Sequence, residues 1–368
     1  MVPKSLRNQV THITGALVPS QNPTWNECPY IIIWEVTRRC ALACRHCRAS
    51  AHSRPDRFEL STSEGKGLLR QIAELGPKIL VLTGGDPFAR ADLLDLVQHA
   101  TGNLGLQVAL SPSATPTLLE APLSQFVVAG VRRISLSLDA ATEARHDAWR
   151  GVPGTWRRTL TAVAQARGCG VEVQINSTLG AFNADAFDAL KDLMAEIEPA
   201  LWNLFFLVPT GRGRREAMLE PEATERLLER LADFQQEAPF AVKTTEAPQF
   251  RRVALQRWRA RGGHRPPSTL GVGDGRGFAF ISHRGEVFPS GFLPIPCGNI
   301  RERSLSSIYR HHYVFRQLRD PDQLKGKCRR CEFRTLCGGS RARAFAVSGD
   351  YLAPEPTCPY QPSGGEPC

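Results

Sequence analysis

The sequence lacks any run of about 18 apolar residues, the length that a membrane-spanning helix requires. Its first residues, 1–7, lead into no apolar segment of the kind that a secretory signal peptide contains. It has no internal repeat, and no nucleic-acid-binding motif lies near its arginine clusters, although the formal net charge is +10. We therefore expect a cytoplasmic protein that binds neither a membrane nor a nucleic acid.

What the sequence does contain is a large apolar fraction and many cysteines. With 368 residues and 42% hydrophobic content, the chain can bury a sizeable core and should form one large domain and a smaller one. Its 11 cysteines are odd in number and concentrate in two short runs. This pattern favours metal ligation in a reducing compartment over a secreted disulfide framework.

The first run consists of Cys40, Cys44 and Cys47, directly after the β-branched stretch 31–36. Three thiolates on one loop can hold three irons of a 4Fe–4S cluster and leave the fourth iron open for chemistry. A structural zinc site needs four ligands, and here the fourth would have to be His46 or His52. We predict the cluster and keep the zinc loop as the alternative.

Short apolar or β-branched runs alternate with helical patterns from about residue 30 to residue 210. This alternation is typical of β-α units with a parallel sheet, whose functional residues lie at the carboxyl ends of the strands. The predicted class is α/β, a partial (β/α)6 TIM-like barrel with a small C-terminal cysteine-rich domain. The predicted strands are 31–36, 79–83, 107–111, 133–138, 171–176 and 203–208, with a later hairpin at 278–282 and 286–289.

The cysteine spacing, on the loop after the first strand, resembles that of the radical S-adenosylmethionine (SAM) enzymes. In that family the amino and carboxylate groups of SAM bind the open iron, and reductive cleavage gives a 5′-deoxyadenosyl radical that takes a hydrogen atom from substrate. The resemblance implies catalytic roles for Cys40, Cys44 and Cys47. It also implies a flavodoxin- or ferredoxin-type electron donor.

The same resemblance assigns SAM-binding roles to residues at the ends of several strands. Gly84-Gly85-Asp86-Pro87 resembles the family's G-G-E-P motif, which holds the SAM amino group; an ordinary strand-to-helix turn is the alternative. The other expected SAM contacts are His46 near the adenine, Ser137 and Arg150 at the ribose and carboxylate, Asp139 acting with them, Asn176, and Leu207 and Val208 lining the adenine.

The second run comprises Cys328, Cys331 and Cys337, with the distant Cys358 as a fourth thiolate. Four thiolates can close a second 4Fe–4S cluster, although they also suit a zinc ribbon. The region resembles the SPASM extension of radical SAM enzymes, which carries auxiliary clusters. The ligand positions for a further, inner cluster are filled by Ser290, Arg303, and Ser340 or Arg341, so we expect one auxiliary cluster with no open iron.

The resemblance divides the chain into a radical SAM partial barrel at 28–213, a helical connector at 214–268 and a SPASM/twitch-like domain at 269–360. Cys297 could be a remnant ligand, and Cys297 and Tyr309 are candidate hydrogen donors because both are redox-capable. For Cys297 and Cys368 a free thiol is the simpler interpretation.

The subgroup most resembled lies near the heme-synthase-like enzymes of the alternative heme pathway, which act on iron porphyrins. An anionic tetrapyrrole would suit the many arginines. A sugar or nucleoside substrate stays open. A peptide substrate is less expected, because about 27 residues before Cys28 are too few for a leader-binding domain. Outside enzymes, a redox-sensing or scaffold protein with iron–sulfur or zinc sites remains the alternative.

Overall fold

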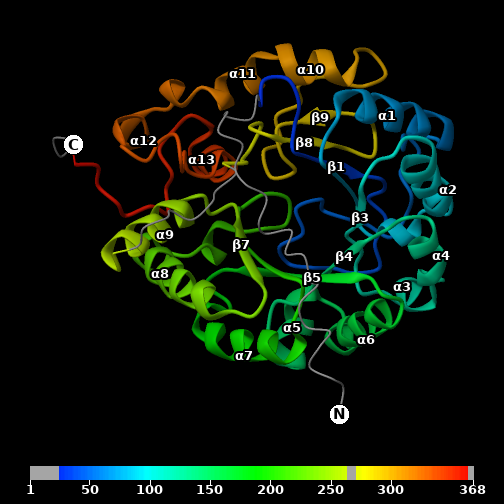
Figure 1. The fold of residues 1–368 in the computed structure, drawn as a ribbon, viewed down its shortest axis with the longest axis horizontal. Coiled ribbons are helices and arrows are strands. Elements are labelled where there is room, and N and C mark those ends of the chain that lie inside the picture. Colours follow the sequence, from blue (N-terminus) through cyan, green and yellow to red (C-terminus); the bar gives the residue numbers. More distant parts are fainter. Residues whose placement is uncertain (1–24, 263–270, 364–368) are drawn as a thin grey trace.

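The computed structural model describes residues 25–262 and 271–363. Its centre is a nine-stranded sheet with the order β7-β6-β5-β4-β3-β2-β1-β8-β9. All neighbouring strands run parallel except β8 and β9, which are antiparallel. The sheet curves round on itself and helices cover its outer face (Figure 1). The predicted α/β class with a parallel sheet is therefore confirmed.

The strands are β1 Ile31–Glu35, β2 Ile79–Thr83, β3 Val108–Leu110, β4 Arg133–Ser137, β5 Glu172–Leu179, β6 Leu201–Phe206, β7 Ala241–Thr245, β8 Phe278–Ile281 and β9 Val287–Phe288. The helices that follow the strands of the main sheet are α1 Thr62–Leu75, α2 Leu93–Gln98, α3 Pro116–Glu120, α4 Leu123–Val128, α5 Glu143–Arg150, α6 Thr155–Gly168, α7 Phe187–Ile197, α8 Pro221–Glu237 and α9 Gln249–Ala260. The C-terminal helices are α10 Leu305–His311, α11 Tyr313–Arg319, α12 Gly326–Arg330 and α13 Arg341–Ser348. Short 3₁₀ or π segments are η3 Pro87–Ala89, η4 His99–Asn103, η5 Ala184–Ala186, η6 Arg215–Ala217 and η7 Pro321–Gln323.

Helix α1 shows how local sequence fixes an element of the outer layer. Ser61 caps its N-terminus: the Ser61 hydroxyl accepts from the Glu64 amide at 3.3 Å, and the Glu64 carboxylate accepts from the Ser61 amide at 2.8 Å. Such a reciprocal cap is worth about 1 kcal/mol. Gly76 ends the helix at a φ of 73°, which favours glycine. Leu68 and Ile72 face the sheet and are fully buried.

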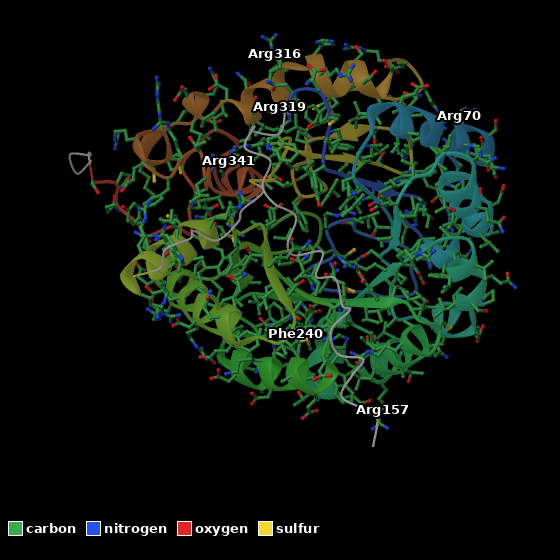
Figure 2. The ribbon with its side chains drawn as sticks, viewed as in Figure 1. Arg70, Arg157, Phe240, Arg316, Arg319 and Arg341 are labelled. Carbon is green, nitrogen blue, oxygen red and sulfur yellow. The ribbon has the colours of Figure 1, made fainter. Side chains whose placement is uncertain are left out.

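Alternate residues of each strand point to opposite faces of the sheet. Trp34, Leu82, Leu136 and Trp202 pack under the helices in the main hydrophobic core. Their neighbours along the strands therefore lie on the inner face. Charged side chains such as those of Arg70 and Arg157 point outward from the helical layer (Figure 2). The inner face of the sheet is therefore the face on which we look for a binding site.

The structure differs from the prediction at two strands, β7 and β8. The segment 214–268, predicted as a helical connector, contains α8 and α9 but also β7, which pairs with β6. The hairpin predicted to open the small domain contributes β8, which pairs in parallel with β1 and so extends the main sheet. The predicted boundary at 268/269 lies outside the described residues. The three-part division of the chain stays a prediction.

Helices α10 and α11 lie at the rim of the molecule beyond β8 and β9, and α12 and α13 follow beside them (Figure 1). Ala342 of α13 packs with Val208, just after β6, and with Leu293 in a small apolar cluster. No helix in the ranges 25–262 and 271–363 is long and apolar enough to cross a membrane.

Candidate active site

The three clustered cysteines lie on the loop between β1 and α1. Cys40 and Cys44 are 7% and 8% exposed, and neither they nor Cys47 form a disulfide. The Sγ atoms accept from backbone amides, Cys40 from Leu42 at 3.3 Å and Cys47 from Ala51 at 3.4 Å. Burial raises the pKa of Cys40 to about 11 and also raises that of Cys44. Thiolates here need a compensating positive charge, which bound iron would supply, so the donor set fits a cluster.

The Gly84-Gly85-Asp86-Pro87 turn, between β2 and η3, packs directly against the start of this loop. The amides of Gly85 and Asp86 donate to the carbonyls of Thr37 and Arg39 at 2.8 and 2.7 Å. A Cβ atom on Gly85 would lie 2.5 Å from the Arg39 oxygen, and one on Gly84 would lie 2.6 Å from the Thr37 oxygen. Both glycines are thus required for contact between the two loops.

The carboxylate of Asp86 is buried within this turn. It accepts from the Thr115 hydroxyl at 2.5 Å and from the Phe88 amide at 3.2 Å, at the start of η3. Burial raises the pKa of Asp86 above its usual value. The predicted role of the turn in holding the SAM amino group stays a prediction.

A second contact to the cysteine loop was not assigned from sequence. Gly211, after β6, has a φ of 60°, and a Cβ atom there would lie 2.2 Å from the Arg48 carbonyl oxygen. The Arg212 guanidinium donates to the carbonyls of Cys44 and Ala51, each at 2.8 Å, and its amide donates to Cys47 at 3.0 Å. In the sequence, the only local signal for this contact is the turn Gly211-Arg212-Gly213.

We expect Gly211→Ala to lower the rate of SAM cleavage tenfold or more, because the new methyl group displaces the loop that carries the cysteines. Gly76→Ala is the matched control: its φ is 73°, but nothing lies within 4 Å of a Cβ atom there. Both substitutions carry the cost of a left-handed backbone, about 1–2 kcal/mol. Iron content and 5′-deoxyadenosine formation are measured for both. Equal effects in the two variants would mean that the contact with Arg48 is unimportant.

Asp139, directly after β4, organises the predicted SAM-binding side chains. It is fully buried, pairs with the Arg150 guanidinium at 2.7 Å and accepts from the Thr178 amide at 2.8 Å. Burial alone would raise the pKa of Asp139, but the charge of Arg150 outweighs it and holds the pKa below its usual value. The same guanidinium lies 3.7 Å from Cys44 Sγ. The carboxylate, the guanidinium and a cluster cysteine thus form one connected group.

His46 lies beside this group, 3.9 Å from the Asp139 carboxylate, and stacks on Trp149 with ring centroids 5.4 Å apart. Burial lowers the pKa of His46 to about 3, so its ring is neutral. His46 Nδ1 and Arg150 Nε are buried without a hydrogen-bond partner among the described residues. Polar groups of bound SAM could satisfy both atoms.

The remaining predicted SAM contacts lie at the ends of β4, β5 and β6. Ser137 and Asn176 are paired in register on the inner face and are half-buried. The Asn176 amide oxygen accepts from Gln174 at 2.7 Å. Leu207 and Val208 are buried just beyond β6. The strand ends place these residues on the same side as the cysteine loop, while their contacts with SAM stay predictions.

The second set of cysteines lines a single pocket at the C-terminal end of the structure. Cys328, Cys331, Cys337 and Cys358 all border it. Cys337 Sγ accepts from the Gly339 amide and Cys328 Sγ from the Glu355 amide, each at 3.4 Å. Burial raises the pKa of Cys337 to about 12. As at the first site, thiolates in this pocket require bound positive charge.

The residues that replace cysteine at the ligand positions of an inner cluster make other contacts. The Ser340 hydroxyl bonds the Glu246 carboxylate, and the Arg341 guanidinium donates to the carbonyls of Tyr351 and Ala353 at 3.1 and 2.7 Å. Ser290 is buried and Arg303 is exposed. Across 25–262 and 271–363, no three His, Cys, Asp or Glu side chains are grouped around a single metal position.

The two candidate hydrogen donors lie in the hydrophobic core and at neither set of cysteines. Cys297 and Tyr309 are both buried in the main hydrophobic core. The Tyr309 hydroxyl donates to the Trp25 carbonyl at 2.7 Å, and the Cys297 thiol donates to the Ile295 carbonyl at 3.5 Å. Cys368 lies outside the described residues.

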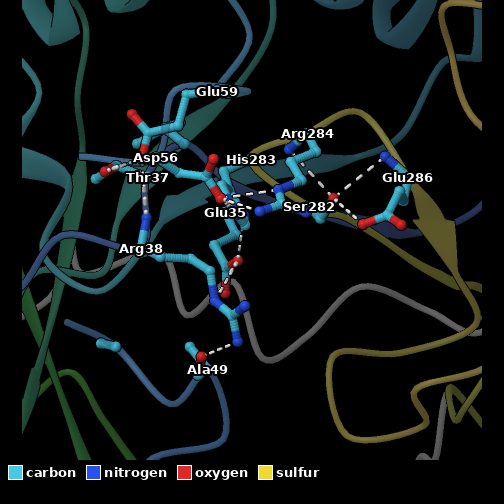
Figure 3. A network of polar contacts seen from close by, with 12 residues as sticks. Glu35, Thr37, Arg38, Ala49, Asp56, Glu59, Ser282, His283, Arg284 and Glu286 are labelled. Carbon is cyan, nitrogen blue, oxygen red and sulfur yellow. Dashed lines mark hydrogen bonds and ion pairs between the residues drawn. The ribbon is translucent and has the colours of Figure 1, made fainter. Parts of the chain in front are cut away.

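A buried polar network joins the β8–β9 hairpin to the cysteine loop (Figure 3). The His283 ring lies between two carboxylates, with Nδ1 3.0 Å from Glu35 and Nε2 3.0 Å from Asp56. Arg48, next to Cys47, donates to the other oxygen of Glu35 at 2.8 Å. Burial tends to raise the pKa of Glu35, but Arg48 and His283 hold it below its usual value.

We expect Glu35→Gln to lower the free energy of unfolding by about 2 kcal/mol, because it removes the carboxylate that is the counter-charge of Arg48 and a hydrogen-bond partner of the buried His283. Glu64→Gln is the control, because Glu64 makes its ion pair with Arg301 at the surface. Anaerobic urea titration of the two cluster-loaded variants measures the difference. An unfolding midpoint of Glu35→Gln equal to that of Glu64→Gln would contradict the role given to the network.

The model of the radical SAM superfamily matches residues 34–194, and that of an iron–sulfur cluster-binding SPASM domain matches residues 274–332. An AdoMet-dependent heme synthase of Oleidesulfovibrio alaskensis is 41% identical over 90% of this chain and 87% of its own.

More distant relatives differ in their named activities. A PqqA peptide cyclase of Rhizobium meliloti is 28% identical over 91% of this chain and 88% of its own. An Fe-coproporphyrin III synthase of Methanosarcina barkeri is 28% identical over 89% of this chain and 87% of its own. Among solved structures, Streptococcus suis SuiB bound to S-adenosylmethionine has a TM-score of 0.68 at 17% identity, over 91% of this chain and 78% of its own. That likeness concerns the fold.

Proposed function

Because the chain belongs to the radical SAM superfamily and carries a SPASM iron–sulfur domain, we propose that it converts propionate side chains of an iron porphyrin to vinyl groups. The chain is an enzyme that uses SAM and iron–sulfur clusters. The observation that carries the finer proposal is the 41% identity to an AdoMet-dependent heme synthase over nine-tenths of the chain.

The reaction balances as a one-electron oxidation of each substrate radical. When bound, a reduced cluster and SAM supply a 5′-deoxyadenosyl radical that takes a hydrogen atom from the propionate carbon next to the macrocycle. The substrate then loses carbon dioxide from its carboxylate and one electron, leaving the vinyl group. An iron–sulfur centre is the class of acceptor that this electron requires, and a flavodoxin- or ferredoxin-type protein would donate the initial electron.

The residues of this chain divide the work of binding and protection. Cys40, Cys44 and Cys47 would hold the first cluster, and Cys328, Cys331, Cys337 and Cys358 the second. Arg150 and Asp139 form the buried ion pair beside Cys44 and would orient SAM through the unpartnered guanidinium nitrogen. The fixed positions of these groups limit the freedom of the reacting atoms.

The inner face also suits a flat apolar ring. Phe205 of β6 lies on that face, 6.2 Å from Phe292 between ring centroids. Phe280 of β8 lies on the same face under the Arg48 guanidinium, 4.5 Å away. The half-buried Phe205 offers aromatic surface to a porphyrin, whose macrocycle is apolar, while Phe280 is buried beneath Arg48.

A direct assay tests this proposal. The anaerobically reconstituted enzyme is incubated with SAM, dithionite and iron coproporphyrin III, and the products are analysed by mass spectrometry. We expect loss of carbon dioxide and two hydrogen atoms for each propionate converted. Formation of 5′-deoxyadenosine without any change in the porphyrin would contradict the proposed substrate. A peptide or a sugar substrate, both expected as alternatives, would then be tested next.

A further inference from the structure

Lys243 lies in the middle of β7, the strand that sequence analysis did not predict. Its neighbour Val242 packs outward into the main hydrophobic core. Because successive residues of a strand point to opposite faces, Lys243 lies on the inner face. Lys243 is the only charged residue of β7.

The register of the sheet relates Lys243 to the predicted SAM site. Ser137 of β4 pairs with Asn176 of β5, Asn176 pairs with Asn203 of β6, and Asn203 pairs with Lys243. These four residues form one row across the inner face. Neighbouring strands are about 4.8 Å apart, so the backbone of Lys243 is about 10 Å from that of Asn176. A substrate beside SAM would lie within reach of a lysine side chain placed there.

The charge of Lys243 is not neutralised by the protein. No carboxylate of the described residues lies within ion-pair distance of its ammonium, and Arg133, whose charge acts on Lys243, is itself paired with Glu172 at 2.6 Å. The Lys243 residue keeps solvent-exposed surface, while its ammonium is desolvated by the protein around it. This desolvation and the charge of Arg133 lower the pKa of Lys243 to about 8, so the ammonium is mostly protonated at neutral pH.

We propose that Lys243 binds a carboxylate of the substrate on the inner face of the sheet, beside SAM. The inference rests on the proposed function, in which the carboxylate is a porphyrin propionate. Lys243 is then a positioning residue, because it holds one side chain of the macrocycle while another meets the reacting atoms. A solvated lysine that only protects the edge strand β7 is the alternative, and it predicts that loss of the charge leaves carboxylate binding unchanged.

Binding titrations separate these possibilities. Absorption of iron coproporphyrin III and of its tetramethyl ester is followed with wild type, Lys243→Met, Lys243→Arg and the outer-layer control Lys191→Met, all loaded with iron and SAM. We expect Lys243→Met to weaken binding of the free acid about tenfold to a hundredfold, as loss of a charge-assisted hydrogen bond should. Binding of the ester should not change, Lys243→Arg should retain most of the affinity, and Lys191→Met should behave as wild type.

Three results would overturn the inference in different ways. If Lys243→Met binds the acid as tightly as wild type, Lys243 does not contact the carboxylate. If it weakens acid and ester equally, its effect is structural; Lys243→Gln and the thermal unfolding of each variant check this point. If wild type binds neither compound, the proposed function fails first, and the assignment of Lys243 fails with it.

Discussion

A variant carrying Cys40→Ala, Cys44→Ala and Cys47→Ala is expected to lose all formation of 5′-deoxyadenosine from SAM. The three thiolates on the β1–α1 loop are the only ligands proposed for the first cluster, and no other cysteine of the described residues lies on that loop. The variant should still bind about four irons, because the second set of cysteines is separate and complete. Anaerobic reconstitution followed by iron analysis and chromatography of the reaction mixture measures both quantities.

Cys169→Ala is the control for this experiment, since Cys169 ends α6 and has no proposed ligand role. It should retain wild-type iron content and product formation. Product formation by the triple variant would contradict the radical SAM assignment of these cysteines. Binding of zinc in place of iron by the wild-type protein would support the scaffold alternative.

The second large effect is expected from Arg343→Met. Arg343 of α13 is 1% exposed and donates to the carbonyls of Leu207 and Glu246 at 3.2 and 2.7 Å. It also pairs with Glu355 at 3.2 Å, in the segment that leads to Cys358. One side chain thus ties the ends of β6 and β7 to the pocket of the second cluster.

Removing this guanidinium leaves the buried carboxylate of Glu355 without its ion-pair partner. We expect the free energy of unfolding to fall by about 3–5 kcal/mol, as for other buried pairs broken on one side. Arg330→Met is the control, because Arg330 of α12 is exposed and its side chain has no hydrogen bond among the described residues. Anaerobic urea titration with parallel iron analysis compares the two. Equal stability of the two variants would contradict the role of Arg343 as the connection between the sheet and the cluster pocket.

Local sequence patterns were sufficient to locate strands β1 to β6, although β5 extends to Leu179 and β6 begins at Leu201, two residues before the predicted start. The strands from β1 to β6 read as apolar or β-branched runs because one face of each packs under a helix. Strand β7 did not, since the sequence Ala241–Thr245 has only Val242 in the core. A short strand at the edge of a sheet with polar residues on its inner face leaves little periodic signal.

Contacts between distant segments could not be predicted from the sequence. The pairing of β8 with β1 joins residues far apart in the chain, and nothing local in Phe278–Ile281 specifies this partner. The same holds for the contact of Gly211 with the cysteine loop and for the links made by Arg343. Each depends on three-dimensional packing, which only the folded chain defines.

The most direct test of the account follows a hydrogen atom. Iron coproporphyrin III deuterated at the propionate carbons next to the macrocycle is incubated with the reconstituted enzyme, SAM and dithionite, and the 5′-deoxyadenosine is analysed by mass spectrometry. The account predicts one deuterium in the nucleoside, together with a vinyl group in the porphyrin. Nucleoside without deuterium, formed at the same rate with and without the porphyrin, would contradict it.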